Sequence, residues 1–376
     1  MFKRVLIANR GEIAVRIIRA CQEMGIETVA VYSDEDADAM HVRLADYSYN
    51  IGPADASESY LNIDALMEAA ERTEADAVHP GYGFLSEDAD FAEMVTKAGM
   101  TWIGPWADTI RKVGDKDEAR AAMIPSGIPM SKGSTPLTSV EDAVEQAKDV
   151  GYPIILKPVA GGGGKGMLIA NSEDDLRNIL TIIDINKVKY YFEHYIEHSR
   201  HIEVQIVADN YGHVIHLGER ECSLQRRNQK LLEESPSIAL TPDRRAEVGA
   251  LAIKAAKSVH YNNIGTVEFL LDLKTNQFNF MEINPRIQVE HGVTEAVTGI
   301  DLVRTQIRIA AGESLDLQQE DVKFTGHAIE CRINAEDPDN NFMPSPGKID
   351  FFLEPGGPRV RVDSGVCAGL SISPYY

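Results

Sequence analysis

Short apolar strands and amphipathic helices alternate along the first 113 residues. Apolar, β-branched runs predict strands at Lys3–Ala8, Thr28–Tyr32, Ala75–Val78 and Thr101–Ile103. Between them, apolar residues recur at helical spacing, as over residues 13–21, where Gly25 marks the helix end. Strands that alternate with helices are typical of a parallel sheet covered on both faces. We therefore expect a doubly wound, parallel α/β domain over residues 1–113.

The pattern changes after residue 113. Residues 114–130 hold one amphipathic helical stretch followed by turn-rich residues, which predicts a hinge. Ser139 then opens a further helix, and strands are predicted at Ile154–Lys157 and Met167–Ala170, on either side of a run of glycines. We expect residues 131–196 to form a small α/β lobe.

Strand patterns dominate residues 197–376. They predict strands at His201–Val207, His213–Leu217, Thr266–Leu273, Gln277–Ile283 and Ala328–Asn334. Strands that follow one another favour a larger antiparallel sheet. The fold class expected for the whole chain is therefore a combination of α/β and α+β. Because the chain stops directly after a strand-like region, we expect its last domain to be truncated.

Composition and charge exclude several classes of protein. Lys and Arg number 37 against 58 Asp and Glu, a net charge of −21, so we expect no nucleic-acid partner. No apolar run approaches the roughly 18 residues of a membrane span, and the N-terminus lacks a signal-peptide core. The four cysteines lie far apart without a C-x-x-C pair, which favours reduced thiols in a cytoplasmic protein over disulfides or zinc.

The glycine cluster within Lys157–Met167 is the most specific local feature of the chain. Its backbone N–H groups, with a lysine at each end, can close over a polyphosphate. Its spacing is not that of a P-loop, and the first βα turn, Asn9–Glu12, lacks the G-x-G-x-x-G of a dinucleotide fold. A flexible surface linker is the alternative. The position between two predicted strands favours a mobile phosphate-binding lid.

A second polar constellation lies within Phe278–His291. If this segment is extended, period-two geometry puts Glu282, Asn284, Arg286, Gln288 and Glu290 on one side. Glu268, on the preceding predicted strand, can sit beside Glu282. Two carboxylates and an amide oxygen suit Mg²⁺, and a guanidinium and an amide beside a carboxylate make a small-anion pocket with its own base. The alternative is a solvated polar face.

The segment Glu219–Lys230 carries four cations in an acidic protein. Taken alone, it is equally compatible with a salt-bridged surface and with a binding site for an anion.

Six motifs together resemble the biotin carboxylase family, the ATP-grasp component of biotin-dependent carboxylases such as acetyl-CoA carboxylase. They occur in the family's order over essentially the whole chain, at Val5–Ala20, His79–Glu87, Lys157–Met167, Glu219–Lys230, Glu282–His291 and Glu330–Pro338. The resemblance implies an ATP-grasp fold, in which the glycine-rich lobe is the mobile lid. It also implies that ATP phosphorylates bicarbonate to carboxyphosphate and that the ureido nitrogen of biotin is then carboxylated.

The resemblance also implies a role for each matching residue. ATP would be held by Lys116, Lys157, Gly163, Gly164, Glu193, Ile196, His201, Gln225 and Asn228. Mg²⁺ or Mn²⁺ would lie on Glu268, Glu282 and Asn284. Bicarbonate would bind Lys230, Arg286, Gln288 and the backbone of Val289, with Glu290 as its base, and biotin would bind Arg332 and Tyr82.

Partners follow from the same resemblance. The chain has no A-M-K-M-type biotin acceptor, so we expect a separate biotin carboxyl carrier protein. The resemblance further implies a carboxyltransferase partner, a homodimer of the full-length protein and a role in fatty acid biosynthesis. Alternatives are the equivalent component of a pyruvate, propionyl-CoA or urea carboxylase, a carbamoyl-phosphate-synthetase-like ligase, or a non-enzymatic scaffold. The scaffold alternative predicts loss of catalytic side chains, yet they are present.

Three features depart from the family pattern. Asn228 stands where many relatives have His, so we expect an altered nucleotide contact there. The segment between Met167 and Glu193 is several residues shorter than usual, and the family normally continues beyond Tyr376.

Overall fold

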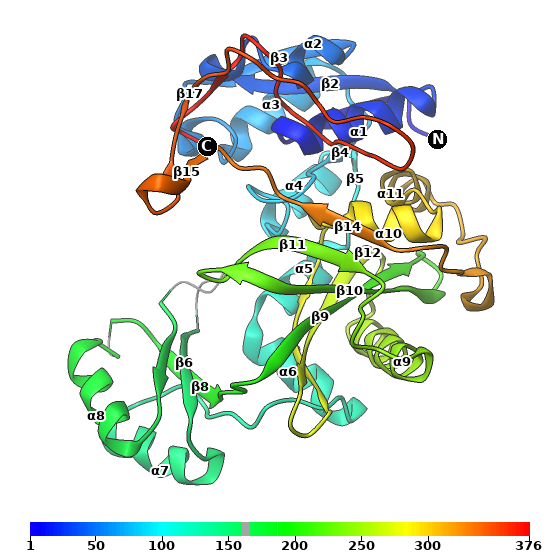
Figure 1. The fold of residues 1–376 in the computed structure, drawn as a ribbon. Coiled ribbons are helices and arrows are strands. Elements are labelled where there is room, and N and C mark those ends of the chain that lie inside the picture. Colours follow the sequence, from blue (N-terminus) through cyan, green and yellow to red (C-terminus); the bar gives the residue numbers. More distant parts are fainter. Residues whose placement is uncertain (160–165, 186) are drawn as a thin grey trace.

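The computed structural model describes residues 1–159, 166–185 and 187–376. Figure 1 shows three parts: a parallel-sheet domain at the top, a long antiparallel sheet in the middle and a small lobe at the lower left. The expected combination of α/β and α+β architecture is therefore confirmed. None of the helices within the described ranges is both long and apolar enough to cross a membrane.

The N-terminal sheet is five-stranded, parallel throughout, and ordered β3-β2-β1-β4-β5. Its strands are β1 (Arg4–Ile7), β2 (Glu27–Ser33), β3 (Tyr47–Gly52), β4 (Ala77–His79) and β5 (Thr101–Trp102). Sequence patterning missed β3, because this edge strand is largely exposed and carries no apolar run.

Helices cover both faces of this sheet. Val5 and Ile7 of β1 point into a core with α1 (Gly11–Glu23), while Leu6 and Ala8 point into a core with the opposite helices. Those helices are α3 (Ile63–Arg72), α4 (Ala89–Lys97) and α5 (Ala107–Gly114). Alternate side chains of one strand thus serve two cores, as a doubly wound sheet requires.

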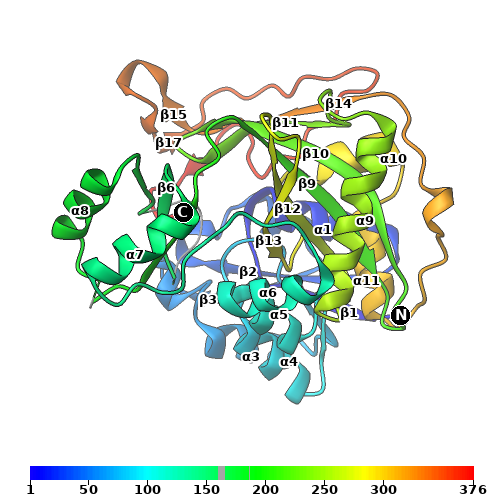
Figure 2. The same cartoon turned by 90° about the horizontal axis from the view of Figure 1, so that it is seen from below.

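The small lobe follows helix α6 (Lys116–Met123). Its three-stranded sheet, ordered β7-β6-β8, packs against two helices around its own apolar core, separate from the rest of the chain (Figure 2). The elements are α7 (Val140–Val150), β6 (Ile154–Pro158), β7 (Leu168–Ala170), α8 (Glu173–Ile182) and β8 (Tyr190–His194). Strand β8 was not predicted from the sequence.

The large sheet is antiparallel, as expected, with the order β13-β12-β9-β10-β11-β14. Its strands are β9 (Ser199–Ala208), β10 (Val214–Arg226), β11 (Gln229–Ser235), β12 (Asn263–Asp272), β13 (Phe278–Asn284) and β14 (Ala328–Cys331). The predicted strand Ala328–Asn334 therefore ends three residues early. Strand β11 was missed, and it pairs with β10 through a tight turn in which Arg227 and Asn228 both have positive φ.

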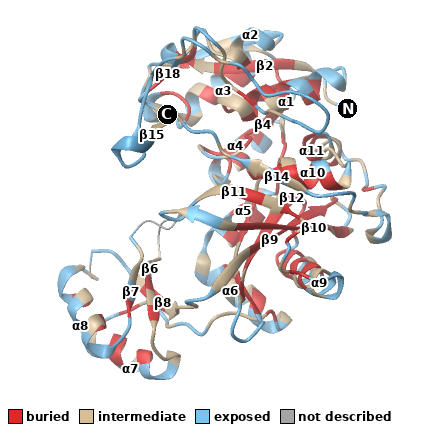
Figure 3. Cartoon of the chain, in the orientation of Figure 1, coloured by how far each residue is buried: buried red, intermediate tan, exposed pale blue. Residues whose placement is uncertain are grey.

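The helices that follow the first strands of the large sheet pack against it: α9 (Pro242–Ser258), α10 (His291–Thr298) and α11 (Leu302–Ala310). Helix α11 shares a core with α1, so the two sheet domains are joined by apolar packing. After β14 the chain runs back, largely exposed, along the N-terminal domain (Figure 3). There Gly365 lies directly on the backbone of Gly11 and Glu12.

Candidate functional site

Lys230, the lysine of β11, is the centre of the candidate site. Its ammonium nitrogen lies 2.5 Å from Glu203 of β9, 2.9 Å from Glu268 of β12 and 2.8 Å from Glu290, just before α10. These three carboxylates are almost completely buried. Buried charges persist only where they are paired, so this cluster binds the sheet to the loop beyond β13. Lys230, a cation of the basic segment Glu219–Lys230, is thus part of a site, whereas Arg227 of the same segment lies exposed in the turn.

A second buried cation, Arg220, shares Glu203 with Lys230. Arg220 of β10 has no exposed surface and donates hydrogen bonds to Glu203, Gln205, Thr266 and Thr294. Burial by itself would raise the pKa of Glu203, but Lys230 and Arg220 bring it down to about 2. Glu203 therefore stays an anion in its ion pair with Lys230.

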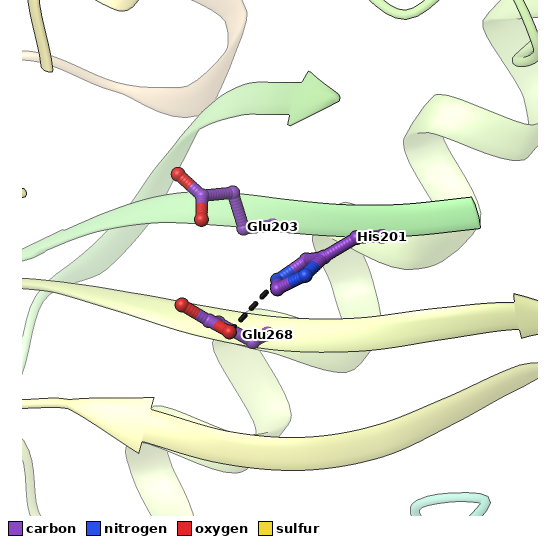
Figure 4. A group of neighbouring side chains, drawn as sticks. All are labelled: His201, Glu203 and Glu268. Atoms are coloured by element: carbon purple, nitrogen blue, oxygen red, sulfur yellow. Dashed lines mark ion pairs between the residues drawn. The ribbon is translucent and has the colours of Figure 1, made fainter. Parts of the chain in front are cut away.

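His201, Glu203 and Glu268 form a compact group on two neighbouring strands (Figure 4). One ligand atom from each lies within 4.8 Å of the others, and His201 Nε2 lies 2.8 Å from Glu268 Oε2. Burial opposes the charge on His201, yet Glu268 raises the pKa of this imidazole. Conversely, burial would raise the pKa of Glu268, but Lys230 and His201 lower it. The negative charge of Glu268 is thus compensated by the His201 imidazole and the Lys230 ammonium.

The three expected metal-binding residues do come together. Glu268 and Glu282 are directly opposite each other on β12 and β13, and Asn284 Nδ2 lies 2.9 Å from Glu268 Oε1. Burial, followed by the charge of Glu268, raises the pKa of Glu282, while Lys116 at the start of α6 lowers it. Two carboxylates forced together and an amide oxygen fit a hard divalent cation, which would relieve their repulsion.

The geometry predicted for Arg286, Gln288 and Glu290 was wrong. The strand ends at Asn284, because Pro285 has no N–H to continue the ladder, and the chain then turns toward α10. Gln288 and Glu290 nevertheless reach the cluster, with Gln288 Nε2 3.5 Å from Glu268 and Glu290 bound to Lys230. Arg286 pairs with Glu87 of the N-terminal domain at 2.5 Å, not with Glu290.

Arg332, just beyond β14, is clamped between two carboxylates. Its Nε lies 2.8 Å from Glu233 of β11, and its Nη2 lies 2.8 Å from Glu290. Burial and the charge of Glu290 raise the pKa of Glu233 to about 7 despite Arg332, and burial with Glu233 and Glu290 raises that of Glu330 to about 8. Two carboxylates therefore pair with one guanidinium, and Glu330 lies within electrostatic reach of it.

Tyr82 lies on the N-terminal side of this group. Its hydroxyl donates to Glu12 of α1, and burial followed by Glu12 raises the pKa of the phenol. Arg332 and Glu330 also act on that pKa, which places Tyr82 within electrostatic reach of the clamped guanidinium.

The residues expected to hold a nucleotide lie on the small lobe, on the large sheet and on the segments next to them. Lys157 of β6 lies 2.7 Å from Glu193 of β8, and His201 Nδ1 lies 3.0 Å from Gln225 Nε2. Ile196 is half-buried between β8 and β9. Val289, whose backbone was expected to bind bicarbonate, has its carbonyl 3.2 Å from His291 Nδ1. Asn228 occupies the β10–β11 turn. Gly163 and Gly164, and with them most of the expected lid loop, fall outside the described residues.

Several charged residues of the cluster were not found from the sequence. Glu203, Arg220 and Glu233 are fully buried, on β9, β10 and β11. Only Glu203, between the apolar residues Ile202 and Val204, carried a signal that could have identified it, because an isolated charge within an apolar strand is costly.

Comparisons with known proteins agree with this arrangement. Residues 1–110 match the biotin carboxylase N-terminal domain, residues 115–318 the carbamoyl-phosphate synthase L chain ATP-binding domain, and residues 330–376 the biotin carboxylase C-terminal domain. The chain is 55% identical to biotin carboxylase 1 of Bacillus subtilis and 53% identical to a biotin carboxylase of Nostoc. Both alignments cover 100% of this chain and 85% of the relative.

Solved structures give the same result. A biotin carboxylase complex with β-γ-ATP from Campylobacter jejuni matches with a TM-score of 0.95 at 47% identity, covering 100% of this chain and 85% of the other. The biotin carboxylase domain dimer of Hydrogenobacter thermophilus 2-oxoglutarate carboxylase, in complex with MgADP, ADP and bicarbonate, matches with a TM-score of 0.94 at 48% identity, covering 100% and 84%. By sequence and by fold, the chain belongs to the biotin carboxylase family.

Proposed function

We propose that this chain carboxylates biotin on a carrier protein with ATP and bicarbonate, through carboxyphosphate, as the first half-reaction of acetyl-CoA carboxylase. The observation that carries the proposal is the continuous series of ion pairs from Lys230 through Glu290 to Arg332. It joins an anion-binding ammonium, a candidate base and a candidate biotin-binding guanidinium within one buried cluster.

Bicarbonate binds at the ammonium end of this series. Lys230, Arg286, Gln288 and the backbone of Val289 supply its hydrogen-bond donors. Glu290 is the base, because bicarbonate must lose a proton to attack the γ-phosphate and a carboxylate within hydrogen-bond reach can accept it.

The metal and the nucleotide lie beside this pocket. Glu268, Glu282 and Asn284 hold Mg²⁺ or Mn²⁺, which when bound neutralises phosphate charge. The nucleotide lies between the large sheet and the lobe, held by Lys116, Lys157, Gly163, Gly164, Glu193, Ile196, His201, Gln225 and Asn228. In this proposal residues 1–113 and 197–376 form the two walls, residues 131–196 are the lid, and residues 114–130 are its hinge.

Biotin binds at the other end of the series. Arg332 lies beside Glu290 and stabilises the enolate-like form of the deprotonated ureido group, since a fixed guanidinium is well suited to an oxyanion. Tyr82 bounds this pocket from the N-terminal domain.

In this proposal the partners are a biotin carboxyl carrier protein and a carboxyltransferase. The full-length protein is a homodimer, is located in the cytoplasm and acts in fatty acid biosynthesis. Support comes from relatives named biotin carboxylase at 50–55% identity. The second candidate is the equivalent component of another carboxylase. It is favoured by a 2-oxoglutarate carboxylase small subunit that is 49% identical and by a pyruvate carboxylase component of Methanothermobacter thermautotrophicus that is 48% identical.

The test is phosphate release from ATP with bicarbonate, with and without free biotin. We expect release to require bicarbonate and to increase with biotin. Release that instead depends on ammonia would favour a carbamoyl-phosphate-synthetase-like ligase, and no release under either condition would favour a scaffold. Carboxylated carrier protein, supplied to acetyl-CoA, pyruvate and 2-oxoglutarate carboxyltransferases in turn, distinguishes the two acceptor candidates.

A further inference from the structure

An ion-paired triad joins the helix before the lobe to two strands of the lobe. Arg120 of α6 lies 2.8 Å from Glu193 Oε1 on β8, and Lys157 of β6 lies 2.7 Å from Glu193 Oε2. Each carboxylate oxygen thus has its own cation. The Glu193 side chain is only 14% exposed, so it would be poorly compensated by water if it lost both partners.

Arg120 also holds the chain segment that enters the lobe. Its Nη2 donates to the carbonyl of Ser131 at 3.1 Å, while its Nη1 binds Glu193. Gly133 packs against this pair: an added Cβ would lie 3.3 Å from Arg120 Nη2 and 3.3 Å from Glu193 Cγ. The guanidinium is therefore fixed by two partners and by close packing, whereas Lys157 has one carboxylate partner among the described residues.

The two cations differ in what they can do when a nucleotide arrives. Lys157 stands at the start of the glycine-rich segment and carries a mobile ammonium that can turn to a phosphate. Arg120 lies one helical turn beyond Lys116 on the same face of α6 and is anchored at Ser131. A triphosphate carries more negative charge than one carboxylate, so a bound nucleotide competes with Glu193 for Lys157.

We propose that Arg120 is a positioning residue for nucleotide binding: it keeps Glu193 paired and oriented when Lys157 leaves Glu193 for the phosphates. This rests on the proposed function, in which Lys157 and Glu193 both face ATP. In the free protein Glu193 has two cations and tolerates the loss of one. In the nucleotide complex Arg120 is its remaining partner, so Arg120 contributes more to the complex than to the free chain.

The test is a double-mutant cycle on affinity for a non-hydrolysable Mg²⁺–ATP analogue, with melting temperature measured on the same preparations. We expect Arg120→Met to weaken binding by about 10-fold, the scale of one charged hydrogen bond, with little change in melting temperature. Arg120→Lys should restore part of the affinity. Arg111→Met, which removes an exposed cation of α5 with its own ion pairs, is the matched control and should change neither quantity.

The second arm of the cycle places the same change in a Lys157→Met background. There Glu193 depends on Arg120 both with and without nucleotide, so Arg120→Met should no longer affect the affinity and should now lower the melting temperature. If Arg120→Met lowered the affinity equally in the wild-type and Lys157→Met backgrounds, the proposal that Lys157 leaves Glu193 for the phosphates would be overturned. A lower melting temperature with unchanged affinity in the single variant would show a purely structural Arg120.

The failure of the proposed function would be seen separately. It would appear as a wild-type chain that binds the ATP analogue but releases no bicarbonate-dependent phosphate, while the affinity cycle remains measurable.

Discussion

Glu290 and Arg332, 42 residues apart in the chain, meet in an ion pair of 2.8 Å. The other oxygen of the same carboxylate lies 2.8 Å from Lys230. One carboxylate therefore separates two cations that the proposed reaction uses for different substrates, and a proton taken from bicarbonate would arrive next to the biotin-binding guanidinium.

Replacing Glu290 by Gln should reduce bicarbonate-dependent ATP cleavage by roughly 10²-fold or more, the scale of removing a general base. The affinity for ATP should be nearly unchanged, because the metal-binding residues and the lobe are untouched. Phosphate release, nucleotide affinity and melting temperature are measured on one preparation. A stable variant with near-normal turnover would contradict the role of base, and a variant that loses only stability would identify Glu290 as a partner of Lys230 and Arg332.

Glu282→Gln should weaken Mg²⁺-dependent ATP binding and abolish turnover. Burial and Glu268 raise the pKa of Glu282 in the free protein, so protons compete with a bound cation for this carboxylate at higher pH than they would at an ordinary glutamate. The apparent Mg²⁺ affinity of the wild type should therefore fall as the pH is lowered, and that of the variant should depend less on pH. Mg²⁺ titrations of phosphate release and of nucleotide binding measure both. Wild-type Mg²⁺ dependence in the variant would place the metal elsewhere.

Glu233 should make the free energy of unfolding fall as the pH rises. Its folded pKa is raised from 4.5 to about 7, so between these values the folded chain keeps a proton that the unfolded chain has released. The free energy of unfolding from this source is fully present below about pH 4.5 and is lost as the pH rises to about 7. The total decrease is about 3 kcal/mol at 1.36 kcal/mol per pKa unit.

Denaturant unfolding of Glu233→Gln between pH 5 and pH 8 measures this effect. The variant should show a shallower decrease in stability with pH than the wild type, and Glu320→Gln, at an exposed position, should match the wild type. Identical slopes for all three chains would show that Glu233 does not titrate in this range.

Gly365→Ala should destabilise the attachment of the C-terminal segment to α1. An added Cβ would lie 2.5 Å from the backbone nitrogen of Glu12 and 2.6 Å from Gly11, and backbone cannot move aside as a side-chain end can. A loss of about 1–3 kcal/mol is expected, as for other overpacked sites. Gly356→Ala, in the same segment with no neighbour within 4 Å, is the control. Equal unfolding free energies for the two variants would contradict the close approach.

The sequence predicted the parts of the fold that strong periodicity specifies. The buried strands β1 and β12 and helix α1 have continuous apolar or helical patterns, and all were located. Two of the strands that were missed, β3 and β11, are polar on at least one face and depend on their neighbours in the sheet.

For the site, the sequence predicted which residues take part but not which residues they contact. Residue identity and the family motifs identified Glu268, Glu282 and Glu290, but the partners of these residues depend on tertiary structure. The extended geometry assumed beyond Asn284 failed at Pro285, and the pairing of Arg286 with Glu87 joins residues 199 apart. No local pattern can predict such a contact, because it is set by how two domains pack.

The apolar core between α1 and α11 determines which parts of the molecule can unfold independently. Side chains from β1, α1, β9, β10 and α11 fill one continuous cluster, so the parallel-sheet domain has no boundary at which it could be cut free without exposing that cluster. The lobe, in contrast, encloses its own core. A calorimetric scan should therefore resolve at most two transitions, with both sheet domains melting as one cooperative unit and only the lobe able to melt alone.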